Sequence, residues 1–147
     1  MLKPELVLSK ADVLARCVGA DADEILVDAR PKPRWAGEAP EPRAGIRSGR
    51  VPGSACVPFF DILNGTARTF KSRSEIEGMF KEAGADLGAM DAGAGRKIVA
   101  SCGTGVTACV LSLGAAMVRK DGTPLPVYDG SWTEWGAEDS GCPVDGK

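Results

Sequence analysis

Histidine is absent from this chain of 147 residues. A Ser-His-Asp triad and a histidine-based metal site are therefore excluded within the chain. Cysteine occurs five times without any C-x-x-C pair, and the four cysteines other than Cys102 are too scattered to predict a zinc site. An odd number of cysteines in this arrangement also argues against a disulfide framework and for a reducing compartment. We predict no metal ion.

A surplus of charge of either sign is also lacking. Eighteen basic and twenty acidic residues give a formal net charge of −2, so the composition does not indicate nucleic acid as a partner. No apolar run approaches the length of a membrane span, so no membrane partner is predicted. The start of the chain has neither a signal-peptide core nor an Arg-rich transit sequence. We predict a cytoplasmic location, or a mitochondrial one if a targeting segment was removed.

Apolar runs and helix signals alternate along the chain. The length fits one domain, residues 1–147, with one core. Helices are predicted after the N-cap Ser9 and after Ser72, where Glu75 completes a capping box, and residues 84–95 form a connection. The predicted strands are residues 24–28, 55–59, 97–102 and 125–129. This alternation predicts an α/β fold, a parallel sheet of about five strands with helices on both faces.

The stretch around Cys102 is the most informative part of the sequence. A buried strand stops at this cysteine, a loop with two glycines follows, and an apolar helix runs from about residue 107 to 119. The loop can curl around the sulfur with several N–H groups inward, and Gly103 and Gly105 permit a positive φ there. The N-terminal end of the helix adds positive potential, so both effects favour the thiolate, which is the nucleophile.

Helical spacing of apolar residues predicts which side of this helix is buried. The residues with that spacing are Val106, Cys109, Val110, Leu113 and Met117. We therefore expect Cys109 in the core. Trp132 and Trp135, three residues apart on one helical face, are expected to be packing residues, with Trp132 a candidate for the wall of a pocket. The polar residues 137–147 are expected to form a loose tail.

Residues 31–53 form a long segment rich in Pro, Gly and Arg. A loop of this length in a compact domain is usually functional or disordered. Its arginines suit a carboxylate ligand, so the segment is either a substrate-binding flap or a solvated surface loop. Composition leaves both interpretations open. Asp28 and Arg30, just before it, are interpreted as a solvated pair at a strand end with a structural role.

Several motifs together resemble the 3-mercaptopyruvate sulfurtransferases, which are proteins of the rhodanese fold. Residues 102–107 read C-G-T-G-V-T, the form of the active-site loop in that family. The motifs V-D-A-R, R-W-A-G, P-E-P-R, G-R-V-P-G-S and Y-D-G-S-W-T-E-W follow the family's order. The resemblance runs from about residue 9 to 136, and it is to the second, catalytic domain of proteins with two rhodanese domains.

The resemblance implies roles for individual residues. Cys102 is the expected nucleophile, and the hydroxyl of Thr104 is expected to relay a proton. Arg34 and Arg43 match the two arginines that bind the substrate's carboxylate, whereas Arg47 is expected to face solvent. The N–H groups of the loop are expected to stabilise the anionic sulfur, from Gly103 through Gly105 and Val106 to Thr107. Arg50 stands where many rhodaneses have a histidine.

The implied reaction moves sulfane sulfur from 3-mercaptopyruvate to Cys102, which becomes a persulfide, and releases pyruvate. The expected acceptor is a thiol, such as thioredoxin or a small thiol, or cyanide. No cofactor is expected. Members with two domains support the Thr104 hydroxyl from an N-terminal rhodanese domain, so such a domain is an expected partner.

Three other functions compete with this interpretation. A thiosulfate sulfurtransferase has the same fold, but its loop resembles C-R-K-G-V-T, and here Gly103 and Thr104 are uncharged. A rhodanese-like phosphatase needs C-x5-R, and Ala108 stands at the arginine position, which excludes it. A non-catalytic regulatory or docking module is the third, although such inactive modules typically lack the cysteine. A rhodanese module that needs a missing partner domain for its activity is kept as a variant of the main interpretation.

Overall fold

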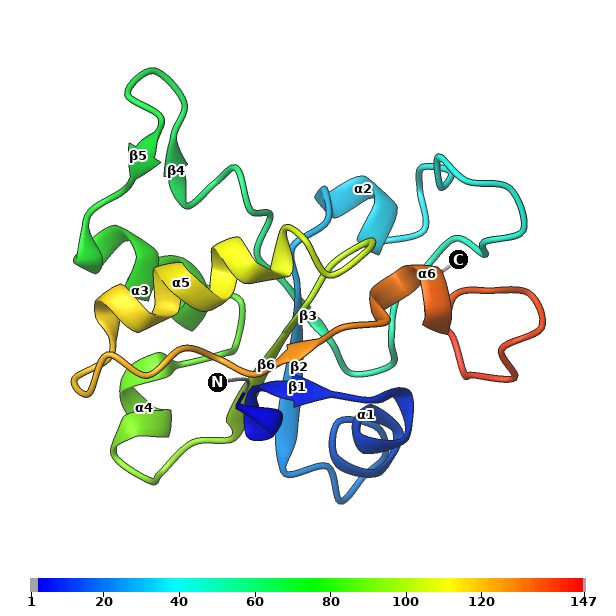
Figure 1. The fold of residues 1–147 in the computed structure, drawn as a ribbon, viewed down its shortest axis with the longest axis horizontal. Coiled ribbons are helices and arrows are strands. Elements are labelled where there is room, and N and C mark those ends of the chain that lie inside the picture. Colours follow the sequence, from blue (N-terminus) through cyan, green and yellow to red (C-terminus); the bar gives the residue numbers. More distant parts are fainter. Residues whose placement is uncertain (1–2, 147) are drawn as a thin grey trace.

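The computed structural model describes residues 3–146 and shows a five-stranded sheet in the order β1-β7-β6-β2-β3 (Figure 1). Every neighbouring pair of these strands is parallel. The predicted parallel α/β sheet is therefore confirmed. The strands are β1 (Val7–Leu8), β2 (Glu24–Asp28), β3 (Ala55–Cys56), β6 (Lys97–Ser101) and β7 (Val127–Tyr128).

Helices cover both faces of this sheet, as predicted. Figure 1 shows α3, α4 and α5 on one side of the strands and α1 and α6 on the other. The helices are η1 (Pro4–Leu6), α1 (Lys10–Arg16), α2 (Lys32–Trp35), α3 (Arg73–Glu82), α4 (Leu87–Asp91), α5 (Ala108–Val118) and α6 (Ser131–Trp135). Within residues 3–146, no helix has the length and apolarity needed to cross a membrane.

The two central strands explain why the chain has two hydrophobic cores, one on each face of the sheet, instead of the single core that was predicted. Side chains of a strand alternate between the faces of a sheet. Ile25 and Val27 of β2 accordingly pack with α3 and α5, while Leu26 packs on the opposite side with α1 and α6. The same alternation in β6 places Cys102, the next residue after the strand, on the α5 side.

The helix starts were predicted correctly because capping is local. Ser9 accepts a hydrogen bond from the backbone N–H of Asp12, and the Asp12 carboxylate accepts one from the N–H of Ser9. Ser72 and Glu75 form the same reciprocal pair at the start of α3. Each capping box satisfies N–H groups that the first helical turn leaves without partners.

The sequence did not predict the shortest elements. These are η1, β1, α2, α4 and the antiparallel hairpin of β4 (Leu63–Asn64) and β5 (Thr69–Phe70). Strands β1, β4 and β5 have two residues each and show no period-2 pattern, so the sequence did not predict them. Helix α4 lies in the predicted connection 84–95, where the side chain of Asp86 caps it by accepting the N–H of Ala89.

The predicted buried face of α5 is wrong. Val106, Leu113 and Met117 are exposed, and so is Cys109, which was expected in the core. The buried residues of α5 are instead mostly small: Ala108, Leu111, Ser112, Gly114, Ala115 and Val118. Small side chains allow a close approach, since a Cβ on Gly114 would lie 2.8 Å from Cδ1 of Ile62. Apolar residues occur all round α5, so spacing alone did not distinguish the buried face.

The C-terminal residues are also not a loose tail. Cys142 is buried, and the indole N–H of Trp135 donates to the carbonyl of Pro143. The backbones of Arg50 and Asp145 exchange two hydrogen bonds, which attach the segment to residues 31–53. The Arg50 guanidinium lies 4.5 Å from the centre of the Trp35 ring, so at the position of the family's histidine this chain has a cation–π contact.

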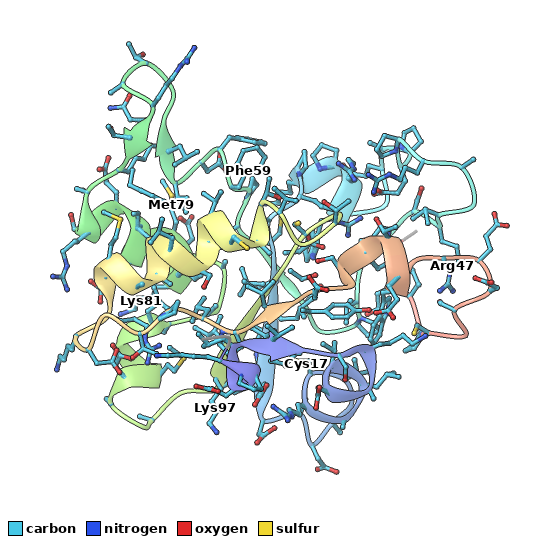
Figure 2. The ribbon with its side chains drawn as sticks, in the orientation of Figure 1. Cys17, Arg47, Phe59, Met79, Lys81 and Lys97 are labelled. Carbon is cyan, nitrogen blue, oxygen red and sulfur yellow. The ribbon has the colours of Figure 1, made fainter. Side chains whose placement is uncertain are left out.

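Arg47 does not face solvent, contrary to expectation. Figure 2 places it beside α6 and the C-terminal loop. Its Nη2 donates to the carbonyl oxygens of Trp135 and Cys142 at 3.1 and 3.0 Å and to Ser140 Oγ at 2.9 Å. The Arg47 side chain therefore connects the end of α6 with two positions of the C-terminal loop.

Arg47→Ala is expected to lower the free energy of unfolding by about 1–3 kcal/mol, because partly buried carbonyls lose a charged donor. Arg96→Ala is the matched control: Arg96 is exposed, and its loss should change stability by less than about 0.5 kcal/mol. Urea unfolding of both variants measures the difference. Equal effects of the two substitutions would contradict the anchoring role of Arg47.

Candidate active site

Cys102 lies at the carboxyl end of β6, beside the end of β2, where Asp28 pairs with Ser101. Ligands of open parallel sheets bind beyond these carboxyl ends. The cysteine is 1% exposed, and its Sγ accepts a hydrogen bond from the N–H of Gly105 at 3.0 Å. The loop therefore curls around the sulfur, but the several inward N–H groups expected from residues 103–107 are reduced to one. Among residues 3–146, Gly105 is the only backbone donor to this sulfur.

The two loop glycines have different reasons to be glycine. Gly105 has φ +92°, and a Cβ there would lie 2.9 Å from the carbonyl oxygen of Asp129. Only glycine meets both constraints without strain. Gly103 does not adopt a positive φ, contrary to expectation, and a Cβ there would lie 3.4 Å from Nη2 of Arg34. That contact is with the end of a side chain, which can move.

The start of α6 holds the loop from the opposite side. The N–H of Trp132 donates to the carbonyl of Cys102 at 2.9 Å, and the N–H of Thr133 donates to the carbonyl of Gly103 at 2.9 Å. The Thr133 hydroxyl donates to the same Gly103 oxygen at 2.6 Å. The first carbonyls of the loop therefore face α6, and the N–H of Gly105 faces the sulfur.

Ser131 fixes the backbone at the cysteine itself. Its Oγ accepts the N–H of Cys102 at 3.1 Å and donates to the carbonyl of Tyr128 at 2.8 Å. Ser131 is fully buried with φ +51°, a conformation that a non-glycine residue adopts only where the surroundings enforce it. Sequence reasoning assigned no role to Ser131 or Thr133, since a turn after a short strand carries no local signal for either.

Most of the predicted site residues line a single cavity of about 480 Å³. These are Cys102, Gly103, Thr104 and Thr107 from the loop, and Arg34 and Arg43 from residues 31–53. Gly105 contacts the sulfur without lining the cavity, and the Val106 side chain is 71% exposed and lies outside it. Other walls include Phe59, Glu41 and Thr133; Figure 2 shows Phe59 near the first turn of α5.

The two arginines reach the cavity with different partners. Arg34 donates through Nε and Nη2 to the two oxygens of Glu41, at 3.2 and 2.5 Å. Arg43 donates through Nη1 to the hydroxyl of Thr133 at 3.0 Å, so it reaches across to α6. Thr133 in turn holds Gly103. Both guanidinium groups thus line the cavity that contains Cys102, as the flap hypothesis requires.

A buried ion network anchors this flap to the sheet. Asp28 and Arg30 are both buried, so the expected solvated pair is wrong. Arg30 pairs with Asp28 at 2.9 Å and with Glu41 at 2.7 Å, and it also donates to the carbonyl of Gly49. The guanidinium lies 4.4 Å from the centre of the Trp132 ring, which therefore packs against Arg30 rather than lining the cavity.

The other cysteines differ from Cys102 in their surroundings. Burial raises the pKa of the Cys17 thiol to about 12. Burial, with a smaller contribution from the charge of Asp28, raises the pKa of Cys56 to about 12 as well. Both thiols are therefore protonated at neutral pH. Residues 3–146 contain all five cysteines, none in a disulfide, and no cluster of His, Cys, Asp and Glu that could hold a metal ion.

Comparison with known proteins agrees with this geometry. The profile of the family described as rhodanese-like domain matches residues 10–138. The chain belongs to the rhodanese family. The mouse 3-mercaptopyruvate sulfurtransferase is 42% identical over 135 residues, which are 91% of this chain and 41% of the mouse protein. The 3-mercaptopyruvate sulfurtransferase of Escherichia coli is 35% identical over 91% of this chain and 43% of its own length.

Solved structures share the fold of this rhodanese domain. A yeast mitochondrial complex I sub-stoichiometric sulfur transferase subunit is 38% identical with a TM-score of 0.73, covering 97% of this chain and 45% of that one. A complex of EanB with hercynine has a TM-score of 0.78 at 22% identity, covering 97% of this chain and 32% of that one, which shows the fold alone. The rhodanese domain spans less than half the length of these relatives.

The geometry predicts different outcomes for the two loop glycines. Gly105→Ala should slow the alkylation of Cys102 by iodoacetamide at neutral pH by roughly tenfold or more, because it displaces the N–H that supports negative charge on the sulfur. Gly103→Ala should change the rate by less than about threefold, since its Cβ meets only a movable side chain. Peptide mass separates Cys102 from the exposed Cys109. Equal rates in the two variants would contradict the assigned role of Gly105.

Proposed function

We propose that this rhodanese domain transfers sulfane sulfur from 3-mercaptopyruvate through a persulfide on Cys102. The observation that carries the proposal is a buried cysteine sulfur that accepts a backbone N–H and opens onto a cavity lined by Arg34 and Arg43. Relatives named 3-mercaptopyruvate sulfurtransferase, at 35 to 43% identity in E. coli, mouse and human, support 3-mercaptopyruvate as the sulfur donor.

In the first step, the Cys102 thiolate attacks the thiol sulfur of the donor. A sulfur–sulfur bond forms, and the bond between that sulfur and carbon 3 breaks, with its electron pair moving to the carbon as the enolate of pyruvate. The proton of the donor's thiol ends on that carbon, so Cys102 persulfide anion and pyruvate are the balanced products. Sulfur is transferred and no electrons are gained or lost overall.

In the proposal, the catalytic loop, residues 102–107, stabilises the charge on the sulfur and relays the proton. The N–H of Gly105, directed at Sγ, supports the negative charge that the sulfur carries before and after attack. The hydroxyl of Thr104 lines the cavity beside Cys102, and in the proposal it relays the proton from the thiol to the enolate. Gly103, Val106 and Thr107 contribute the backbone that closes the loop around the sulfur.

The second step returns Cys102 to its resting form. An acceptor thiolate, or cyanide, attacks the outer sulfur of the persulfide, the sulfur–sulfur bond breaks, and its electrons return to Cys102 as the thiolate. The acceptor leaves as a persulfide or as thiocyanate. We propose thioredoxin or a small thiol as the physiological class of acceptor.

Thiosulfate is a second candidate donor. A rat relative named thiosulfate sulfurtransferase is 40% identical over 75% of this chain, and an Arabidopsis relative at 45% identity carries both donors in its name. Attack on the outer sulfur of thiosulfate would give the same persulfide and release sulfite. The uncharged Gly103 and Thr104 favour 3-mercaptopyruvate as the better donor.

A second rhodanese domain is the proposed partner. Leu113 and Met117 are exposed on α5, and Val106 is exposed in the catalytic loop just before that helix. Exposed apolar residues grouped in this way are typical of protein contacts. A domain bound there would also lie beside the exposed Thr104. We further propose a cytoplasmic location, supported by five cysteines outside any disulfide.

Cys102→Ser is expected to abolish the release of pyruvate from 3-mercaptopyruvate, because an alcohol cannot accept sulfane sulfur in this way. Its thermal unfolding should stay within a few degrees of the wild type. A coupled lactate dehydrogenase assay measures pyruvate, and Cys109→Ser is the matched control, which should keep its activity. Turnover by Cys102→Ser at the wild-type rate would refute the assignment of the nucleophile.

Arg34→Ala and Arg43→Ala should each lower kcat/KM for 3-mercaptopyruvate by roughly tenfold to a hundredfold, the usual cost of a lost charge-assisted contact. Lys32→Ala is the control, since Lys32 is an exposed cation of the same flap that does not line the cavity. The rate at which neutral iodoacetamide modifies Cys102 should change little in any of the three. A loss in Lys32→Ala as large as in the arginine variants would rule out a specific carboxylate site.

A further inference from the structure

The charged side chains around the cavity are unequally compensated. Four of them line it: Arg30, Arg34, Glu41 and Arg43. Arg30 is buried between the carboxylates of Asp28 and Glu41, at 2.9 and 2.7 Å. Three guanidinium groups therefore face two carboxylates, which leaves one guanidinium without a carboxylate partner in the cavity and the network behind it.

Glu41 is the anion that reaches the cavity. Its side chain is 4% exposed, and its two oxygens accept hydrogen bonds from Arg30 and, at both Nε and Nη2, from Arg34. This two-point contact is the one that a guanidinium usually offers to an anionic ligand. Glu41 therefore occupies the two-point binding position of Arg34 from within the protein. Only the Nη1 side of the Arg34 guanidinium is left to bind a sulfur donor.

Arg43 supplies the uncompensated positive charge. Its Nη1 donates to the neutral hydroxyl of Thr133, and among residues 3–146 no carboxylate forms a salt bridge with it. The single carboxylate of a donor can pair with this guanidinium. A dianion would bring a second negative charge close to the buried carboxylate of Glu41, where the low polarity of the surroundings strengthens repulsion.

We propose that Glu41 is a specificity-determining residue that restricts the cavity to donors carrying a single negative charge, by neutralising Arg34. The inference rests on the proposed function. It adds that selection between 3-mercaptopyruvate, a monoanion, and thiosulfate, a dianion, depends on a carboxylate in the flap as well as on the catalytic loop. Glu41 also keeps Arg34 in place, so that its Nη1 side can donate a hydrogen bond to the donor.

The test compares the ratio of kcat/KM for thiosulfate to kcat/KM for 3-mercaptopyruvate in matched variants. Glu41→Gln removes the charge and keeps the size, and it should raise this ratio at least tenfold. Glu41→Asp keeps the charge and should leave the ratio within threefold of the wild type, even if both rates fall. Glu38→Gln, which removes an exposed acid from the same flap, should also leave the ratio unchanged.

A second pair of variants changes the charge at the cavity wall and leaves the side chains of the ion network around Arg30 and Glu41 unchanged. Pro42 is exposed at the cavity wall, so Pro42→Lys adds a cation there, with Pro42→Gln as its control. Pro42→Lys should raise the ratio and Pro42→Gln should not, and this pair decides the question if Glu41→Gln fails to fold. An unchanged ratio in folded Glu41→Gln, or in Pro42→Lys when that variant decides, overturns the inference.

The wild-type protein separates this inference from the function on which it rests. Its intact mass is measured first, after incubation with each donor in turn. If neither donor adds sulfur to the wild type, the proposed function fails. If the wild type gains sulfur and the ratio does not respond to the charge of residue 41, only the role of Glu41 is wrong.

Discussion

A buried guanidinium group organises this domain. Arg30 lies two residues after the end of β2, and a charge at that depth is tolerated only when it is paired and hydrogen-bonded. Asp28 provides one partner from the strand, while Glu41 and the Gly49 carbonyl provide two from the flap. The flap is therefore fixed to the sheet by the need to satisfy Arg30. Because Glu41 also binds Arg34, the same network sets the position of the first cavity arginine.

The catalytic loop depends on a second set of contacts, from α6. Two backbone N–H groups and the Thr133 hydroxyl bind the carbonyls of Cys102 and Gly103, and Ser131 binds the N–H of Cys102. With its first carbonyls held in this way, the loop turns so that the N–H of Gly105 donates to the sulfur, and the positive φ of Gly105 allows that turn. Trp132 packs on Arg30, so the loop support and the flap network meet at one aromatic ring. The sulfur and the arginines are thus placed by connected interactions.

The sequence predicted those parts of the fold and of the candidate site that depend on neighbouring residues. The strand over 24–28, the capping boxes at Ser9 and Ser72, and the strand that stops at Cys102 all follow from local patterns. The placement of Arg34 and Arg43 at one cavity with Cys102 was expected from the resemblance to a family, because composition alone left the flap undecided.

The remaining features depend on contacts that no local pattern encodes. Arg47 binds residues about 90 positions away, and the C-terminal segment is ordered by its pairing with the flap. The buried side of α5 is chosen by small residues that fit against Ile62 and the sheet, so the spacing of large apolar residues predicted the wrong face. The pairing of Arg34 with Glu41, and the supporting roles of Ser131 and Thr133, likewise arise only when the flap, the loop and α6 meet.

Locating the transferred sulfur by mass spectrometry tests the central claim most directly. The wild-type domain is incubated with 3-mercaptopyruvate without an acceptor, trapped with a neutral alkylating agent and digested. The account predicts the added mass of one sulfur atom on the peptide that contains Cys102 and on no other cysteine peptide. Sulfur on the peptide of Cys109 with none on that of Cys102 would contradict the account, and so would an unmodified protein that nevertheless releases pyruvate.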